Sequence, residues 1–204
     1  MAAKPVRLLL ASSNPGKLEE FRELAADGNP PMAFDLLPGF ANLPAFDESA
    51  ETIAENAAGK AIYYCRGASD WVMADDSGLV VPALGGEPGV RSSRYAGPEG
   101  DAARNIVKLL AALHGKTEAE REARFVCVLA LARNGRVEAV FSDSVIGTIL
   151  EAPRGAGGFG YDPVFFHAPS GKTFAELPRA EKNRLSHRGR AFGKLAAFLA
   201  GGRA

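Results

Sequence analysis

Along this chain, short apolar runs typical of strands alternate with segments whose apolar residues recur every three or four positions, as in helices. This pattern predicts alternating strands and helices. The mostly apolar segment 6–11 (VRLLLA) predicts a buried strand, and an amphipathic segment follows it at 12–25. In that segment Asn14 is placed to be an N-cap and Pro15 to be the first helical residue. The chain is therefore expected to begin with a strand, a tight turn and a helix.

The same alternation continues toward the C-terminus. Thr52 and Glu55 have the spacing of a helix capping box, and Asn134-Gly135 between two apolar runs is a strong hairpin signal. The further expected elements are, in chain order, a strand at 33–38, a helix at 52–65, short strands at 71–75 and 79–81 on either side of an Asp-Ser-Gly turn, a helix at 101–115, strands at 123–133 and 136–150, and a helix starting near Ser186. This order predicts an α/β fold with a two-lobed mixed β-sheet flanked by helices and an active-site cleft between the lobes. We expect a single domain over residues 1–204.

Composition narrows the class of protein. The chain has 24 Lys and Arg against 24 Asp and Glu, and this zero net charge argues against generic binding to a nucleic-acid backbone or an anionic membrane. Its two cysteines, Cys65 and Cys127, form no CxxC pair and lie among apolar neighbours. The longest apolar stretch, FVCVLALA, is far too short to span a membrane. We therefore expect a cytoplasmic protein with no nucleic-acid or membrane partner.

Two nucleotide-binding signatures are matched in part by the sequence, but the residues around them do not fit such a site. The segment 155–160 (GAGGFG) has the G-x-G-x-x-G pattern, but strand-like residues follow it where a dinucleotide site needs a helix. The Gly-Lys-Thr triplets at 115–117 and 171–173 lack the earlier glycine of a P-loop. We expect turns at all three places.

The first turn and the second helix offer cations for a phosphate. The turn from Ser12 to Lys17 points backbone N–H groups, the positive end of a helix and an ammonium at one spot. Asn56 and Lys60, four residues apart, share a helix face and could reach a second phosphate oxygen. The alternative in each case is an ordinary capped helix with a surface lysine.

Asp75 and Asp76 follow an apolar run and need an explanation, because burying an ionised carboxylate without a partner is unfavourable. Successive side chains of a strand point to opposite faces, so the two carboxylates cannot act as a shared pair while the backbone is extended. We expect Asp76 to face the cleft with Ser77 beside it, and Asp75 to be tied to backbone or a cation. The alternative is that Asp-Ser-Gly only starts a turn.

Two later segments suggest a site for a purine. In GFGYDP the glycines would let a flat ligand approach the backbone and stack on Phe159, while Asp162 accepts hydrogen bonds from it. In EKNRLSHRGR, His187 and Arg188 fall in the first turn of the last helix, where cations oppose the helix dipole. The alternatives are a Gly-rich turn with one core aromatic and a solvated charge run.

Taken in order, these segments resemble the inosine/xanthosine triphosphate pyrophosphatase family, which removes non-standard purine nucleotides such as dITP, ITP and XTP. The resemblance is carried over nearly the whole chain by SSNPGKLEEF, ENAAGKA, ADDSGL, LGGEPGVRSSRYAG, RFVCVLAL, GGFGYDPVFF, TFAEL and EKNRLSHRGRA. It implies a homodimeric, two-lobed α/β protein. Such a protein uses Mg²⁺ to hydrolyse the bond between the α- and β-phosphates of a purine nucleoside triphosphate.

The resemblance also implies roles for individual residues. Asp76 would be the catalytic acidic residue at the metal and the attacking water, and Ser77 would contact the substrate. His187 and Arg188 would donate to the O6 of hypoxanthine or xanthine, and adenine would be rejected because it leaves those donors unpaired. The remaining residues expected to bind substrate are Ser12, Ser13, Asn14, Pro15, Gly16, Lys17, Lys60 and Lys182 around the triphosphate, and Phe159, Gly160, Tyr161 and Asp162 around the base.

The loop before the second helix departs from the family pattern. It has ESAETI where Glu-x-Gly-x-Thr-Phe is usual, so Ala50 replaces Gly and Ile53 replaces Phe. The family's second metal-binding acid lies just upstream, and its counterpart here is either Asp47 or Glu48. Two other functions stay open: a pyrophosphatase that prefers dTTP, UTP or modified pyrimidines, as Maf-like proteins do, and a nucleotide sensor without catalysis.

Overall fold

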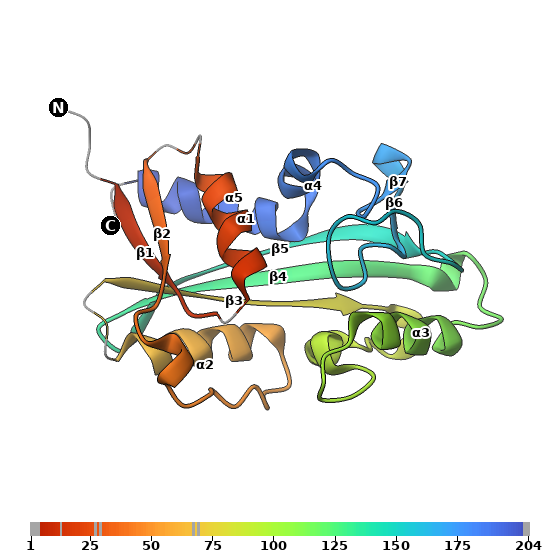
Figure 1. The fold of residues 1–204 in the computed structure, drawn as a ribbon, viewed down its shortest axis with the longest axis horizontal. Coiled ribbons are helices and arrows are strands. Elements are labelled where there is room, and N and C mark those ends of the chain that lie inside the picture. The colour runs from red at the N-terminus through yellow and green to blue at the C-terminus, as the bar shows by residue number, and fades with distance from the viewer. Residues whose placement is uncertain are drawn as a thin grey trace. The chain divides into compact units, whose positions relative to one another are not determined.

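The computed structural model describes residues 5–201 except residues 13, 27, 29, 67 and 69. Its strands are β1 (Val6–Leu10), β2 (Met32–Leu36), β3 (Trp71–Val80), β4 (Glu122–Arg133), β5 (Arg136–Ile149), β6 (Phe165–His167) and β7 (Lys172–Thr173). Its α-helices, labelled in Figure 1, are α1 (Pro15–Ala25), α2 (Ile53–Cys65), α3 (Ala102–Ala112), α4 (Arg179–Leu185) and α5 (His187–Ala200). None of the helices described is both long enough and apolar enough to cross a membrane.

The strands form one open, mixed sheet of seven strands in the order β2-β1-β3-β4-β5-β6-β7. β1 is parallel to both of its neighbours, β2 and β3, whereas β6 is antiparallel to β5 and β7. Between β4 and β5, Asn134 and Gly135 have φ angles of 53° and 77°, as a two-residue type I′ hairpin turn requires. The predicted α/β class, mixed sheet and hairpin are therefore confirmed.

The chain forms two compact units, neither of which is a continuous stretch of sequence. The first unit comprises Met1–Asp76, Cys127–Asp143 and Arg188–Ala204, and the second comprises Ser77–Val126 and Ser144–His187. Each of the long strands β3, β4 and β5 contributes one part to the first unit and the rest to the second. A single functional domain over residues 1–204 stays a prediction.

In the first unit the strands bury apolar side chains on both faces. Leu8, Leu10 and Met73 belong to a core with residues of α1 and α5, whereas Leu9 and Val72 belong to a core with residues of α2. This is the period of two expected of strands that are covered on both sides. Accordingly, α1 and α5 lie on one side of these strands and α2 on the other (Figure 1).

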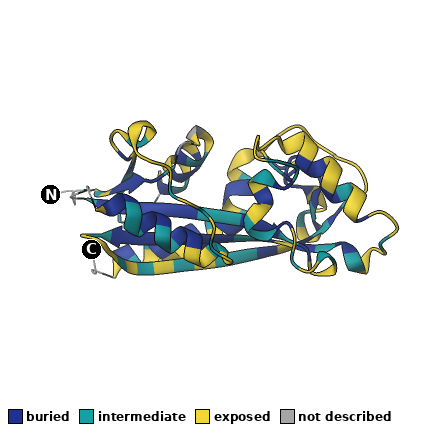
Figure 2. Cartoon of the chain, turned by 90° about the horizontal axis from the view of Figure 1, so that it is seen from below, coloured by how far each residue is buried: buried dark blue, intermediate teal, exposed yellow. Residues whose placement is uncertain are grey.

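The second unit has a separate core. The ring of Phe125 lies 4.5 Å from that of Phe165 and 5.9 Å from that of Phe174, measured between centroids. Leu79 of β3 and Leu109 of α3 are fully buried in the same core. Figure 2 shows how buried residues gather on the strands while the loops are largely exposed.

One expectation about the elements is wrong. β3 is continuous from Trp71 to Val80, so no turn interrupts it at Ser77, because sheet pairing overrides the local turn preference of Asp-Ser-Gly. The charged segment before the last helix forms α4 (Arg179–Leu185), a helix that was not expected, whereas the expected start of the last helix near Ser186 is confirmed, because α5 begins at His187. The sequence gives no start signal for α4, since its N-cap residue is Pro178 and no side chain caps it.

Candidate active site

The alternation along β3 sends its two acidic side chains to opposite sides of the sheet. Met73 belongs to the core with α1 and α5, and Ala74 belongs to the core with α2. Asp75 continues the series of Met73, and Asp76 continues that of Ala74. The two carboxylates therefore face different helices, as expected for an extended backbone.

Two cations, of which Arg188 is buried, contact the Asp75 carboxylate. Its Oδ2 accepts a hydrogen bond from Nε of Arg188 at 2.8 Å and one from the Cys127 thiol at 3.6 Å, and its Oδ1 pairs with Nζ of Lys17. Burial by itself would raise the pKa of Asp75, but the charges of Arg188 and Lys17 outweigh it and hold this pKa well below its usual range. Arg188 is also held by Glu20 of α1, whose Oε2 accepts from Nη1 at 2.8 Å. Asp75 is therefore part of a buried ionic network.

Lys17 reaches this network because of the way α1 begins. The Asn14 side chain caps the helix by accepting a hydrogen bond from the Gly16 N–H at 2.9 Å, which confirms the predicted N-cap. Ser12 Oγ accepts from the Asn14 N–H at 3.1 Å. The side-chain oxygens thus shape the turn, and the Lys17 side chain remains 19% exposed beside it.

Asp76 has the opposite electrostatic environment. Burial raises the pKa of Asp76 to about 6, the charge of Lys60 opposes this shift, and the negative charge of Glu48 adds to it. Such a carboxylate is ionised at neutral pH and is still basic enough to accept a proton. These are the properties of a general base that works near pH 7.

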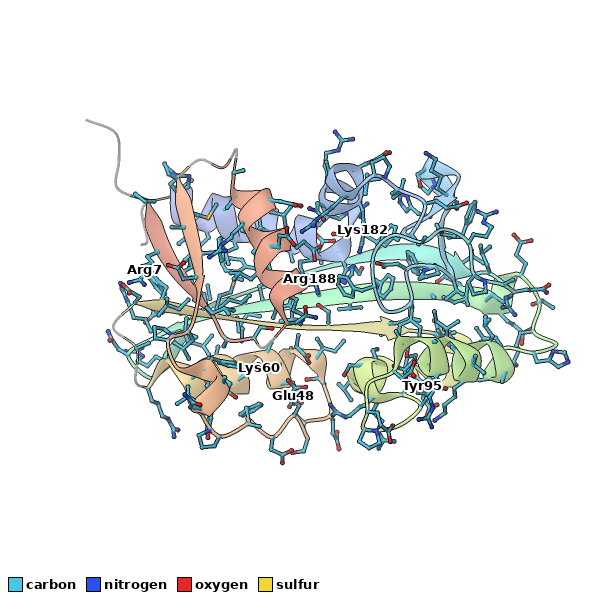
Figure 3. All side chains as sticks on the ribbon, viewed as in Figure 1. Arg7, Glu48, Lys60, Tyr95, Lys182 and Arg188 are labelled. Carbon is cyan, nitrogen blue, oxygen red and sulfur yellow. The ribbon has the colours of Figure 1, made fainter. Side chains whose placement is uncertain are left out.

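The loop before α2 brings only one of its two candidate acids to Asp76. Oε1 of Glu48 pairs with Nζ of Lys60, and the two side chains point toward each other in Figure 3. Asp47 instead accepts a hydrogen bond from Ser49 Oγ at 2.8 Å. Because Glu48 also acts on the pKa of Asp76, the geometry favours Glu48 over Asp47 as the second acid.

The donor set fits a divalent cation that is shared with a substrate. Across the described part of the chain, no three His, Cys, Asp or Glu side chains gather as a metal site built from protein alone. Glu48 and Asp76 do supply two hard carboxylate ligands within electrostatic reach of each other. Mg²⁺ usually takes one or two carboxylates and completes its shell with water and substrate phosphates.

In the second unit, a lysine and an aspartate support the exposed ring of Phe159. Lys182 Nζ lies 2.5 Å from Asp162 Oδ2 and 4.5 Å from the centroid of the Phe159 ring. The same Asp162 oxygen accepts from the Phe159 N–H at 2.8 Å. Gly160 beside the ring has a φ of 61°, a conformation that suits glycine. Since Phe159 is 47% exposed while Lys182 is buried, this arrangement presents an aromatic face above a buried cation.

Two other predicted residues of the second unit are buried in its core. The Tyr161 hydroxyl donates to the Ser92 carbonyl oxygen at 2.8 Å, and burial raises the pKa of Tyr161 far above its ordinary value. The His187 ring stacks on Phe125, with centroids 4.8 Å apart and planes 11° from parallel. Tyr161 therefore supports the loop around Phe159 rather than presenting its hydroxyl to a ligand.

The predicted site residues are divided between the two compact units. Lys17, Lys60, Asp76 and Arg188 belong to the first unit, and Ser77, the Phe159–Asp162 loop, Lys182 and His187 belong to the second. Ser13 and the side chain of Pro15 lie outside the described residues.

Sequence reasoning missed Glu20 and the loop-holding role of Asn56. For Glu20 there was a signal: it lies three residues after Lys17 and so shares its helix face. Asn56 was considered as a possible contact for a phosphate, but its amide contacts the backbone of Ala50.

The mixed α/β fold of this chain is already represented among solved structures. A HAM1 protein from Coxiella burnetii has a TM-score of 0.86 with 39% sequence identity, over 96% of this chain and 99% of that one. The chain belongs to the Ham1 family, whose model matches residues 8–198.

Curated relatives are similar in sequence to this chain over most of their length. A dITP/XTP pyrophosphatase of Geobacillus kaustophilus is 50% identical over 188 residues, which are 92% of this chain and 91% of that protein. One of Thermus thermophilus is 50% identical over 189 residues, 91% of this chain and 88% of that protein. The family resemblance inferred from the ordered motifs is confirmed.

Proposed function

We propose that this protein hydrolyses non-standard purine nucleoside triphosphates, dITP, ITP and XTP, to the monophosphate and pyrophosphate. Relatives with about half of their residues identical carry the name dITP/XTP pyrophosphatase. The observation that carries the chemical part of the proposal is Asp76, whose pKa is raised to about 6 beside Glu48 and Lys60. A Maf-like preference for pyrimidines has no comparable support.

The triphosphate would be bound by the cations of the first unit. The ammonium of the partly buried Lys17 and that of the buried Lys60 each face a carboxylate. The N-terminus of α1, capped by Asn14, adds backbone N–H groups and the positive end of a helix dipole. Ser12 and Gly16 shape this turn, and Lys182 is proposed as a further phosphate contact.

A divalent metal, which we propose to be Mg²⁺, would be held by Asp76 and Glu48 together with phosphate oxygens. When bound, it would neutralise phosphate charge and lower the pKa of a bound water. The protein's own step is taken by the Asp76 carboxylate, which accepts the proton of the water that attacks the α-phosphorus. Lys17 and Lys60 would stabilise the negative charge that moves onto the departing pyrophosphate.

The base would be selected by residues of the last segments. The half-exposed ring of Phe159 offers a surface for stacking, and Lys182 beneath it is fixed by Asp162. His187 and Arg188 are proposed to donate to the O6 of the purine, which adenine lacks. Glu20 and Asp75 hold the Arg188 guanidinium in one orientation and so restrict where it can donate.

A substrate panel tests this function. Purified protein with Mg²⁺ is given dITP, XTP, dATP, dGTP and dTTP in turn, and pyrophosphate and single phosphate are measured separately. We expect pyrophosphate from dITP and XTP at a rate at least about 100-fold above that from dATP, since a polar site rejects an analogue that leaves its donors unpaired. Equal rates on all substrates, or release of single phosphate, would refute the proposal. Binding of dITP without any turnover would indicate a sensor.

We further propose that the protein is a homodimer, as the family resemblance implies, and that it is cytoplasmic, as its cysteine usage suggests. Sedimentation of the purified protein over a range of concentrations tests the dimer. A species of one-chain mass at all concentrations would contradict it.

A further inference from the structure

The loop that carries Glu48 is fixed to α2 on both sides of this acid. On the C-terminal side, the Asn56 amide makes a two-point contact with Ala50. Its Oδ1 accepts from the Ala50 N–H at 3.2 Å, and its Nδ2 donates to the Ala50 carbonyl oxygen at 3.4 Å. A side chain that bonds both polar groups of one residue fixes the position and rotation of that backbone. Ala50 is only two residues from Glu48.

On the N-terminal side, Tyr64 and Gly59 of the same helix hold the loop. The Tyr64 hydroxyl donates to the Pro44 carbonyl oxygen at 3.2 Å and accepts from the Phe46 N–H at 3.0 Å. The Phe46 ring lies so close to Gly59 that a Cβ there would be 2.6 Å from it. Helix α2 therefore positions the loop backbone before and after Glu48, and it also carries Lys60, the partner of Glu48.

Asn56 is poorly placed to bind a phosphate itself. It is 1% exposed, and both ends of its amide are already bonded to Ala50. A nucleotide could reach it only by displacing the loop that brings Glu48 to Asp76. The contact with the loop is therefore the function that the geometry supports.

We propose that Asn56 is a positioning residue: by fixing the backbone at Ala50, it holds the Glu48 carboxylate where it can bind a divalent cation together with Asp76. This inference rests on the proposed function, which assigns both acids to the metal. A ligand on an unsupported loop loses conformational freedom when the cation binds, and this loss weakens binding. A loop fixed beforehand avoids most of that loss.

Asn105 provides a matched control in the second unit. It is 4% exposed, its Oδ1 accepts from the Ala96 N–H at 2.6 Å, and its Nδ2 donates to the Ser93 carbonyl oxygen at 3.0 Å. It thus holds a loop with the same chemistry as Asn56. That loop carries neither Glu48 nor Asp76.

The test is Mn²⁺ binding to the full chain without nucleotide, followed by electron paramagnetic resonance of free Mn²⁺. The variants are Asn56→Ala, Glu48→Gln, the double variant of these two, and Asn105→Ala, with thermal unfolding measured for each. We expect Asn56→Ala to weaken Mn²⁺ binding about 10-fold, as loss of a residue that supports a ligand typically does. Asn105→Ala should lower the unfolding temperature similarly and leave Mn²⁺ affinity unchanged. In the Glu48→Gln background, Asn56→Ala should have no further effect on Mn²⁺ affinity.

If Asn56→Ala does not fold, a Tyr64→Phe variant provides a second test of the same proposal. It removes only the hydroxyl contacts at the other side of the loop, so we expect a smaller loss of Mn²⁺ affinity, about 3-fold. The proposal is overturned if the wild-type protein binds no Mn²⁺, if a folded Asn56→Ala keeps wild-type affinity, or if the two substitutions add independently. Should the Mn²⁺ results hold while dITP is not cleaved, the proposed function alone fails.

Discussion

On its two faces, strand β3 carries an aspartate carboxylate in opposite electrostatic environments. On the side of α1 and α5, Asp75 lies against Arg188 and Lys17, and its pKa is held well below the ordinary range. On the side of α2, Asp76 lies in the field of Lys60 and Glu48, and its pKa is raised to about 6. The two residues are neighbours in sequence, so the difference comes from the helices that cover each face.

This difference separates a structural carboxylate from a chemical one. Burial disfavours the charge of both groups, but only at Asp75 do the ion pairs more than offset it. A carboxylate stabilised so strongly as an anion has no tendency to accept a proton. Asp76 keeps that tendency because its cation, Lys60, is shared with another acid, Glu48.

The largest expected effect is the loss of turnover in Asp76→Asn. Removing the proposed general base should lower kcat for dITP about 10³-fold, while the fold is retained. Pyrophosphate release and circular dichroism measure the two quantities. An Asp76→Asn variant with wild-type kcat would remove this residue from the mechanism.

On the other face, Asp75→Asn should act mainly on stability. It removes the carboxylate that pairs with both the buried Arg188 and the partly buried Lys17, so the free energy of unfolding should fall by about 3–5 kcal/mol. Urea unfolding measures this, and Asp35→Asn is the control. Asp35 pairs with Arg7 and Arg22 at the surface, where such pairs contribute about 1 kcal/mol or less. Equal losses in the two variants would erase the contrast between the faces.

The pH dependence of stability sharpens the comparison. The pKa of Asp76 is raised in the folded state from 3.8 to about 6, so in this pH window the folded protein keeps a proton that the unfolded chain releases. The contribution of this group to stability therefore falls as pH rises from about 4 to 6 and is constant above that range. Asp76→Asn lacks this fall and should be the more stable protein at pH 7, by about 1–3 kcal/mol. A stability difference that does not change between pH 4 and pH 7 would contradict the raised pKa.

A smaller effect is expected from Phe159→Ala in the second unit. Loss of base stacking, which contributes about 1–3 kcal/mol, should raise KM for dITP about 10-fold with little change in kcat. Phe159→Trp is the matched variant and should restore KM, because it also presents an aromatic face. A Phe159→Ala protein with unchanged KM would show that the exposed ring does not contact the base.

Local signals in the sequence were sufficient for much of the fold. The Asn14 cap, the capping box of Thr52 and Glu55, and the Asn134-Gly135 hairpin depend only on neighbouring residues, and all three are confirmed. The alternation of side chains along a strand was also sufficient to place Asp75 and Asp76 on opposite faces. The continuity of β3 could not be predicted, because it depends on pairing with strands distant in the sequence.

Within the candidate site, residue types were easier to predict than their partners. Lys17 and Arg188 were recognised as cations, but sequence spacing cannot show that both meet Asp75. The choice between Asp47 and Glu48 depends on how the loop is fixed to α2, and adjacent residues give no signal for it. Asn56 was considered as a possible phosphate contact because it shares a helix face with Lys60, and the sequence does not show the loop that packs against it.

The most direct test of the contrast between the two carboxylates is their titration in the metal-free protein. Carboxyl carbons of ¹³C-labelled aspartate are followed by NMR from pH 3 to pH 9, and Asp76→Asn assigns one resonance. We predict that the resonance lost in Asp76→Asn titrates with a pKa of about 6 and that the Asp75 carboxyl stays ionised down to the lowest pH at which the protein is folded. Titration of Asp76 near or below its ordinary value of 3.8 would contradict the account.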